Sequence, residues 1–596
     1  MDETGKDVTM KGVAIEGDLN WISSSGTASS QQRALAHHAT FSPIERLPDE
    51  VLSSIFVCFA ARKRIIKVVF NSSLNRHTYK LGWIVITHVC GRWRTVALST
   101  VTLWCQPYFL IPDMAREMLR RSKGAPLAMA FPQLRGAAWD VILEAATKHL
   151  SHTFSLDIVA NTRTKELLLL MTQPAPLLTH LSIYRDDEDI FDLPDSFLGN
   201  EIPPLKSLHL DGVHVPLDSP LYRNVTNLIL RTSNPDFQNH YSTKQWINFL
   251  HGMPGLEILE LVGVLPRSDS VAPESKEPVH LPHLTNASFS SALPQITNFL
   301  QYISMSETAY IRLMNCTFTA VTPTGMVDEL ALLRPVLAGI ASTKQRPIGS
   351  LVVSNEERCP CCVFPLLSFQ TWIRDTVESD HDSESQYRTG DYYYKGSIRL
   401  DVEVSLHGMA FFNADTIMKE MTQSFDLNHL HTLGLETQND PISTETLREC
   451  FGTLPKLRNL SVSQRMIYMF VHAIQVFPEH PLYMIDEDSD DPRDPPQQVF
   501  TKLRTLRIHD TDLTHPGSSG QWRAIESMDY WYGFLRIPLP KVLFSQCILF
   551  GQQVAYLREH SMDLEDGCRT VEVDEAGWDE YYRADEPFHS VFGEDD

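Results

Sequence analysis

Residues 205–210 read Leu205-Lys206-Ser207-Leu208-His209-Leu210 and define the pattern Leu-x-x-Leu-x-Leu. Successive side chains of an extended strand point to opposite faces, so Leu208 and Leu210 share one face and His209 lies on the other. Leu205 adds a third apolar side chain just before the strand. One such strand cannot bury its own apolar face, so the pattern predicts a strand that is packed among neighbours of the same kind.

The same pattern, with apolar substitutions, recurs along the chain. Its copies begin at Leu178, Leu205, Val225, Leu256, Thr308, Ile348, Leu430, Leu457 and Leu503. Leucine-rich repeats have a period of roughly 20 to 29 residues, and spacings of 27, 20 and again 27 residues fit this period, so the longer spacings are expected to contain insertions. Segments 243–251 and 444–452 have helical periodicity between copies. The predicted fold class is therefore α/β: a small all-α unit followed by an irregular leucine-rich-repeat solenoid, or horseshoe, with outer helices.

Composition divides the chain into segments with different expected structures. These are a disordered N-terminal arm (1–40), a helical unit (41–108), the irregular solenoid (109–556) with loop insertions near 375–396 and 486–498, and an acidic C-terminal tail (557–596). The tail has 14 acidic residues and three Arg, a net charge of −11. It is expected to keep the chain soluble or to act as an autoinhibitory arm that covers a basic patch.

The overall charge narrows the class of partner. The 596 residues include 51 Lys and Arg against 74 Asp and Glu, a net charge of −23, which disfavours nucleic acid and membrane surfaces as partners. Segment 1–40 has no apolar core of a signal peptide, and the aliphatic run 167–171 is too short to cross a membrane. Ten cysteines are too few for a disulfide scaffold. We expect a cytoplasmic and/or nuclear protein.

The helical unit has clear helix signals and its own charge. Pro48 suits a first helical position, and Asp49 and Glu50 suit the first turn. Apolar residues then form a broad stripe at 51, 52, 55, 56 and 59. A second helix is expected over 83–98. The unit holds nine basic and three acidic residues, so it is a basic island of charge +6 in an acidic chain.

This unit resembles the F-box, and more closely the F-box-like proteins of mushroom-forming fungi. The resemblance covers about 65 of the 596 residues, and the stretch 60–80 is longer than in the compact F-box. The matching residues are Leu47-Pro48-Asp49-Glu50-Val51-Leu52, Ile55-Phe56, the stretch 81–90 (LGWIVITHVC), Gly91-Arg92-Trp93-Arg94, Ala97-Leu98 and Leu103-Trp104.

The resemblance implies a function. F-box proteins bind a Skp-type adaptor and through it a cullin, so the chain would be the non-catalytic, substrate-recognition subunit of a Skp-cullin-F-box ubiquitin ligase. The repeats would then hold an unknown protein substrate. Because the adaptor of that family is acidic, the basic island would assist the encounter. Carried over by motif, the adaptor-binding residues are Leu47, Pro48, Leu52, Ile55, Val89, Cys90 and Trp93.

Candidate substrate contacts follow from periodicity, because exposed strand positions alternate with buried leucines. They are His209, Arg231, Glu260, Arg312, Arg458 and Arg507. Three alternatives stay open: a leucine-rich-repeat scaffold or interaction protein acting outside a ligase, a helical unit that merely caps the solenoid, and an enzyme whose site the sequence does not reveal.

Motifs of catalysis and cofactor binding are missing from the sequence. Neither a phosphate-binding glycine loop nor a G-x-S-x-G or H-E-x-x-H motif occurs. The cluster Cys359-Pro360-Cys361-Cys362 lacks the second ligand pair that structural zinc uses. The pairs His149 with His152 and His429 with His431 are expected at the surface or at strand ends. No catalytic residue, cofactor or metal is therefore predicted.

Overall fold

The computed structural model describes two compact units, an N-terminal unit that ends at Trp104 and a C-terminal unit that begins at Cys105. The expected N-terminal arm and most of the insertion near 486–498 lie outside the described residues. The described residues are 43–581 apart from 63–66, 72–75, 81, 133–136, 161–163, 186–190, 195, 235–240, 268–277, 342–346, 357–365, 374–385, 390–391, 396, 406–413, 438–441, 464–465, 475–497, 516–517, 566, 574–576 and 579–580.

The N-terminal unit combines short helices with one hairpin. Its elements are η1 (Pro43–Arg46), α2 (Asp49–Arg62), β1 (Lys67–Asn71), β2 (Arg76–Lys80), η2 (Trp83–His88), α3 (Gly91–Ser99) and η3 (Val101–Trp104). Helix α2 begins at Asp49, one residue after the first helical position predicted at Pro48, and buries Leu52, Phe56 and Ala60. The rings of Trp83 and Trp104 meet edge to face at 5.3 Å and complete a small core.

The single helix expected over 83–98 is interrupted in the structure. A 3₁₀-helix, η2, ends at His88, and α3 begins at Gly91. Cys90 between them has extended backbone, and its Sγ accepts a hydrogen bond from the Trp93 amide. The β-branched run 84–87 fits poorly in an α-helix, which favours this break.

The C-terminal unit is dominated by one 16-stranded sheet, most of whose strands are parallel. In spatial order the strands are β3 (Leu127–Phe131), β4 (Thr153–Ala160), β5 (His180–Arg185), β7 (Ser207–Asp211), β9 (Asn227–Arg231), β10 (Ile258–Val262), β12 (Asn286–Ser290), β14 (Tyr310–Cys316), β19 (Ser397–Ser405), β16 (Leu366–Ile373), β15 (Ile348–Glu356), β20 (Thr432–Thr437), β21 (Asn459–Ser463), β22 (Thr505–His509), β23 (Lys541–Ser545) and β25 (Asp563–Leu564).

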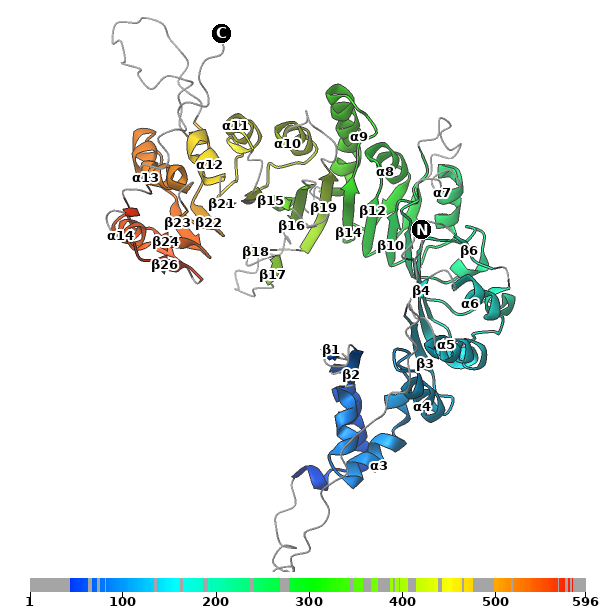
Figure 1. The fold of residues 1–596 in the computed structure, drawn as a ribbon. Helices are drawn as coiled ribbons and strands as arrows, with labels where there is room; N and C mark the ends of the chain where they lie inside the picture. Colours follow the sequence, from blue (N-terminus) through cyan, green and yellow to red (C-terminus); the bar gives the residue numbers. More distant parts are fainter. Residues whose placement is uncertain are drawn as a thin grey trace, which may run out of the picture. The chain divides into compact units, whose positions relative to one another are not determined.

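Helices cover one face of this sheet (Figure 1). They are α4 (Pro112–Ser122), α5 (Ala137–Lys148), α6 (Thr164–Leu170), α7 (Thr243–His251), α8 (Leu293–Leu300), α9 (Pro323–Ala341), α10 (Ala414–Gln423), α11 (Thr444–Phe451), α12 (Met466–Ile474), α13 (Ser519–Phe534) and α14 (Gly551–Glu559). The helices predicted at 243–251 and 444–452 are confirmed as α7 and α11. Ser242 and Ser443 cap their first turns.

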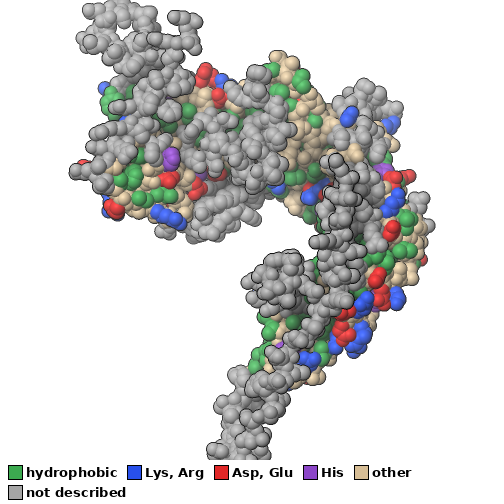
Figure 2. All heavy atoms as spheres, in the orientation of Figure 1, with side chains coloured by type: hydrophobic (Ala, Val, Ile, Leu, Met, Phe, Trp, Pro, Cys, Tyr) green, Lys and Arg blue, Asp and Glu red, His purple; other side chains and the backbone are tan. Residues whose placement is uncertain are grey.

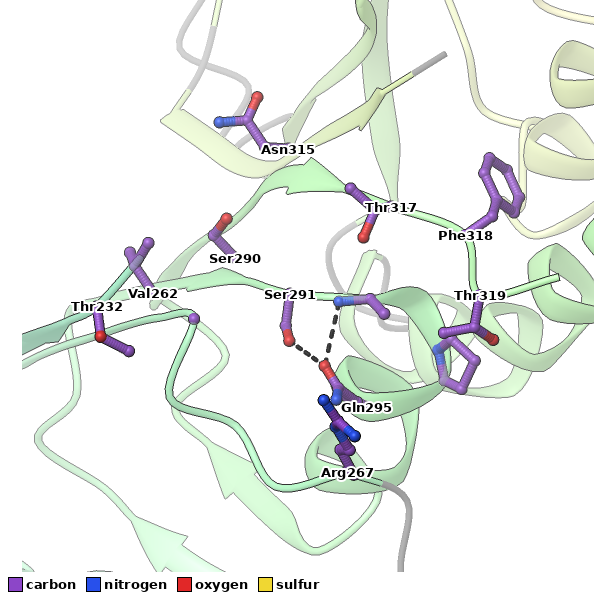
Figure 3. A pocket seen from close by; sticks show the side chains of 13 residues that line it. Thr232, Val262, Arg267, Ser290, Ser291, Gln295, Asn315, Thr317, Phe318 and Thr319 are labelled. Atoms are coloured by element: carbon purple, nitrogen blue, oxygen red, sulfur yellow. Dashed lines mark hydrogen bonds between the residues drawn. The ribbon is translucent and has the colours of Figure 1, made fainter. Parts of the chain in front are cut away.

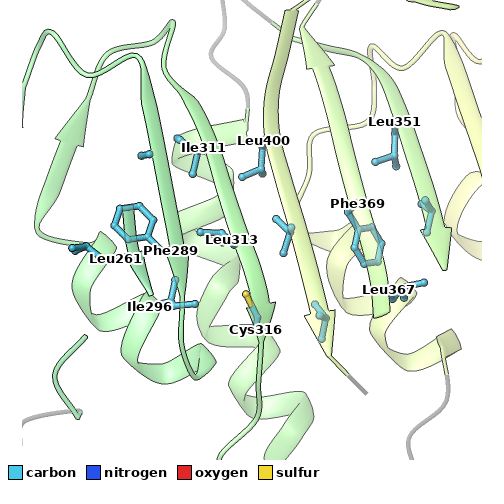
Figure 4. Close-up of a cluster of buried hydrophobic side chains, with 14 of the residues drawn as sticks. Leu261, Phe289, Ile296, Ile311, Leu313, Cys316, Leu351, Leu367, Phe369 and Leu400 are labelled. Carbon is cyan, nitrogen blue, oxygen red and sulfur yellow. The ribbon is translucent and has the colours of Figure 1, made fainter. Parts of the chain in front are cut away.

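The core lies between the sheet and the helices. In β7, Leu208 and Leu210 are buried while His209 is only half-buried, which confirms the predicted alternation. Figure 4 shows the same arrangement across the middle of the sheet, where the buried Ile311 of β14 lies beside Leu400 of β19. The strand face opposite to the helices carries the alternate residues and is called the polar face below.

The expected fold class was wrong. The sequence predicted an all-α unit followed by an irregular leucine-rich-repeat solenoid, whereas the structure is mixed α/β, with a hairpin in the N-terminal unit and one large sheet in the other. Tandem repeats require each strand to pair in parallel with the next along the chain. Here β14 pairs with β19, and β16 runs antiparallel to both β15 and β19. The leucine pattern encodes strands with one buried face but not the order in which they pair.

Smaller sheets flank the large one. They pair β6 (Phe191–Asp192) with β8 (Val213–His214), β11 (Val279–Leu281) with β13 (Ile303–Met305), β17 (Gln386–Thr389) with β18 (Tyr392–Lys395), and β24 (Ile548–Phe550) with β26 (Arg569–Val571). The pair β17 and β18 falls within the insertion expected near 375–396. Among the described residues, none of the helices is long and apolar enough to cross a membrane.

Candidate functional site

The N-terminal unit exposes large aliphatic side chains. Val51 and Ile55 of α2 are each 41% exposed, Val85 of η2 is 52% exposed, and Val89 is 56% exposed. We call these four residues the apolar surface. Helix α2 is apolar on both sides, because Leu52 and Phe56 are buried while Val51 and Ile55 face outward. Figure 2 shows hydrophobic side chains at the surface around α3.

The residues predicted to bind an adaptor differ in how exposed their side chains are. Pro48, Ile55, Val89 and Cys90 are exposed, and Leu47 is half-buried. Leu52 is fully buried in the core of the unit, so it can only support the surface from beneath. Trp93 is half-buried, with its ring centroid 5.0 Å from that of Phe56.

An ion pair connects the starts of the two helices. Arg92, at the first turn of α3, contacts the Asp49 carboxylate at 2.7 Å and also donates to the Leu47 carbonyl oxygen. This contact holds residues 47–49 against α3, which explains how segments about 40 residues apart in sequence come together. Exposed Arg46, Arg62 and Arg94 belong to the same unit, as the predicted basic island requires.

The polar face of the C-terminal unit carries a row of residues that are paired from strand to strand. Four of the predicted substrate contacts, His209, Glu260, Arg312 and Arg507, share this row. Arg231 lies two residues further along β9, opposite Asp211. Arg458 precedes β21 and is exposed at the strand entry. In order of strands the row is Asp157, Ser182, His209, Ile229, Glu260, Ser288, Arg312, Asp401, Gln370, Val352, Gly434, Ser461, Arg507 and Leu543.

His209 and Arg231 lie near each other on adjacent strands. The Arg231 guanidinium contacts the Glu260 carboxylate at 2.5 Å. The His209 ring lies 4.5 Å from that of Tyr184. Burial, and secondarily Arg231, lowers the pKa of His209 to about 4, so this imidazole is neutral at physiological pH.

The most buried charges of the polar face surround Arg312. Its guanidinium lies 2.7 Å from Glu403 and 3.4 Å from Asp401, and both carboxylates are almost fully buried. Ser368 and Gln370 also donate to Asp401, at 3.2 and 3.4 Å. Burial, with the Asp401 carboxylate nearby, raises the pKa of Tyr310 to about 12, so that its hydroxyl remains a donor to Asp401. These internal contacts already satisfy much of the local charge.

The sequence analysis missed Asp401 and Glu403. They reach Arg312 because β19 pairs with β14 over roughly 90 intervening residues, which no local pattern encodes. A usable signal was present: Leu400-Asp401-Val402-Glu403-Val404 alternates apolar and acidic residues, as a strand with one buried face does.

A pocket of about 710 Å³ lies where β10, β12 and β14 end and α8 begins (Figure 3). The described residues that line it include one cation, the exposed Arg267, and otherwise hydroxyl, amide, glycine and apolar residues. Because this lining holds no Asp, Glu, His, Cys or Lys, it offers no general acid or base. The first turn of α8 is already satisfied, since the Ala292 amide donates to Gln295 and the Leu293 amide donates to Thr317.

The described contacts of the histidine pairs are to each other or to a neighbouring cation. His149 and His152 contact each other at 3.2 Å, and burial lowers the pKa of both. His429 faces Lys456 at 2.9 Å. The cluster Cys359-Pro360-Cys361-Cys362 lies outside the described residues. In the part of the chain that the structure describes, no group of three His, Cys, Asp or Glu could hold a metal ion.

Charges on the helices form local pairs. Around α4 and α5, basic and acidic side chains are interspersed (Figure 2). Glu117 pairs with Arg120 and Arg121, and Glu144 pairs with Lys148. Such pairs three or four residues apart are typical of a solvated helix surface.

Comparison with known proteins does not assign the chain to a family. No protein-family model matches the chain, and no curated protein matches it.

Proposed function

We propose that this chain is the non-catalytic, substrate-recognition subunit of a Skp-cullin-F-box ubiquitin ligase. The N-terminal unit binds a Skp-type adaptor, and the polar face of the C-terminal unit binds a protein substrate. The observation that carries the proposal is the apolar surface, which lies on the same unit as the residues similar to the F-box.

The apolar surface supports docking on energetic grounds. Val51, Ile55, Val85 and Val89 leave aliphatic area in water, and burying such area gains about 25 cal/mol per Å². Four exposed aliphatic side chains within a unit of this size mark it as a candidate docking site. Exposed Arg46, Arg62 and Arg94 favour an acidic partner over a basic one.

The C-terminal unit supports the receptor role by its mixture of paired and exposed charges. Arg231 with Glu260, and Arg312 with Asp401 and Glu403, fix the shape of the polar face from within. Arg458 is exposed beside it. A receptor of this kind contributes proximity and orientation rather than chemistry, and it acts in the cytoplasm and/or nucleus.

Co-purification tests the proposal. The tagged full chain should retain a Skp-type adaptor and, through it, a cullin, and Leu47→Ala with Pro48→Ala should lose both. The control is Val321→Glu, at a side chain that is 91% exposed in the C-terminal unit. Retention of the adaptor without a cullin would favour an interaction protein acting outside a ligase. A wild-type chain that retains no adaptor would refute the proposal.

A further inference from the structure

Two cysteines near the C-terminal end of the described chain lie opposite each other on neighbouring strands. Cys547 precedes β24 and Cys568 precedes β26, and these strands pair in parallel with Ile548 opposite Arg569. Cys547 and Cys568 each come one residue before this pair, so the same register places them opposite each other. The Arg569 amide donates to the Cys547 carbonyl oxygen at 2.8 Å. Adjacent strands are about 4.8 Å apart, which falls within the Cα spacing that a disulfide needs.

The two thiols differ in accessibility. Neither forms a disulfide in the structure. Cys547 is fully buried, and its Sγ contacts the Ser545 carbonyl oxygen at 3.3 Å. Cys568 is half-buried, and its Sγ contacts the Phe544 carbonyl oxygen at 3.4 Å. An oxidant can therefore reach Cys568 first.

The preceding residues also approach closely. Gly567 has φ +92°, and the end of the Gln546 side chain lies against it. The positive φ favours glycine at this position, and the contact brings the two segments together immediately before both cysteines.

We propose that Cys547 and Cys568 form a reversible disulfide that fixes the C-terminal strands to the body of the sheet. Strand β25 pairs with β23 through only two residue pairs. The same segment places Glu565 on Arg507 at 3.1 Å. Oxidation would thus keep Arg507, a residue of the polar face, covered by Glu565. The proposal does not rest on the proposed function.

The chemistry is thiol–disulfide exchange with a low-molecular-weight disulfide. The Cys568 thiolate attacks one sulfur of that disulfide, which forms a mixed disulfide and releases one thiolate. That thiolate takes the proton of Cys547, whose sulfur then attacks the Cys568 sulfur of the mixed disulfide and releases the second small-molecule sulfur as a thiolate. Two protein thiols are oxidised and one small disulfide is reduced. The neighbouring Cys547 lowers the pKa of Cys568 while the pKa of Cys547 itself is raised, so Cys568 is the more readily deprotonated of the two thiols.

Peptide mapping tests the proposal. The full chain is treated with oxidised glutathione and digested with trypsin without reduction. Peptides 542–558 and 559–569 each contain one of the two cysteines. We expect them to be linked, at two hydrogens below their summed mass, and to separate on reduction. The link should vanish in Cys568→Ser and persist in Cys450→Ser, which removes a half-buried thiol of α11.

The alkylation rate of the cysteines and the hydrogen exchange of backbone amides test the proposal independently. With iodoacetamide at pH 7, Cys568 should react at least about tenfold faster than Cys450, whose pKa burial raises. Amides of 563–571 should exchange about tenfold more slowly in the oxidised chain. The proposal is overturned if the folded wild-type chain yields Cys568 carrying only glutathione, or no linked peptide. Circular dichroism establishes that each chain tested is folded.

Discussion

Arg312 is the residue of the polar face whose loss should destabilise the protein most. Its partners Asp401 and Glu403 have side chains only 3% and 5% exposed, so removing Arg312 leaves buried carboxylates without their cation. We expect Arg312→Ala to lower the free energy of unfolding by about 3–5 kcal/mol. Arg120→Ala, which breaks a solvent-exposed pair with Glu117, should destabilise the protein far less. Urea unfolding of both variants measures the difference, and equal losses would contradict the assignment.

His209 should contribute a pH-dependent term to stability. Its pKa falls from 6.5 to about 4 on folding, through burial and then Arg231, so the unfolded chain binds the proton more tightly. Lowering the pH from about 6.5 to 4 therefore favours unfolding. Between these pH values the free energy of unfolding should fall by about 1 kcal/mol less in His209→Asn than in the wild type, after allowance for solvent screening. Urea midpoints at several pH values test this, and parallel pH profiles for the two chains would contradict it.

At the residue scale, prediction from sequence succeeded where one strand supplies the information. The alternation around Leu208 places His209 on the polar face, and the structure agrees. The same reasoning predicted Arg458 at an exposed strand position, but it lies just before β21. The leucine pattern predicts the start of a strand only to within a residue or two. The partners of Arg312 could not be predicted, since they come from a strand that pairs across a long separation.

Gly263, at the end of β10, should tolerate no side chain. It has φ +70°, and a Cβ there would lie 2.1 Å from the Thr232 carbonyl oxygen. Gly263→Ala should therefore cost at least about 1–2 kcal/mol of unfolding free energy, from the left-handed backbone and the overlap. Gly255→Ala is the matched control, because a Cβ there meets no atom within 4 Å. Urea unfolding compares them, and equal stability of the two variants would show that β10 and β9 are not held as described.

At the element scale, the sequence predicts strands and helices better than their arrangement. All nine copies of the leucine pattern fall on strands of the large sheet, and α7 and α11 lie where expected. Strand β12 was missed because Ala287 and Phe289 replace the leucines. The antiparallel β16 and the pairing of β14 with β19 depend on contacts between distant segments, so the predicted solenoid was wrong.

At the scale of the whole molecule, the two units should respond separately to core mutations. Leu52 is fully buried in the N-terminal unit and Leu208 in the other. Each Leu→Ala change should destabilise its own unit by about 2–5 kcal/mol. Hydrogen exchange followed by peptide mapping should show faster exchange only in residues 43–104 for Leu52→Ala, and only in residues 105–581 for Leu208→Ala. Faster exchange throughout the chain in either variant would contradict two separate units.

Isothermal titration of the full chain with a Skp-type adaptor measures the docking step itself. Because Ile55 is an exposed aliphatic residue of α2, Ile55→Glu should weaken binding at least about 30-fold, as loss of an interface hot spot does. Val321→Glu should bind as the wild type does. Absence of binding by the wild-type chain, or equal affinity of Ile55→Glu and wild type, would contradict docking through the apolar surface.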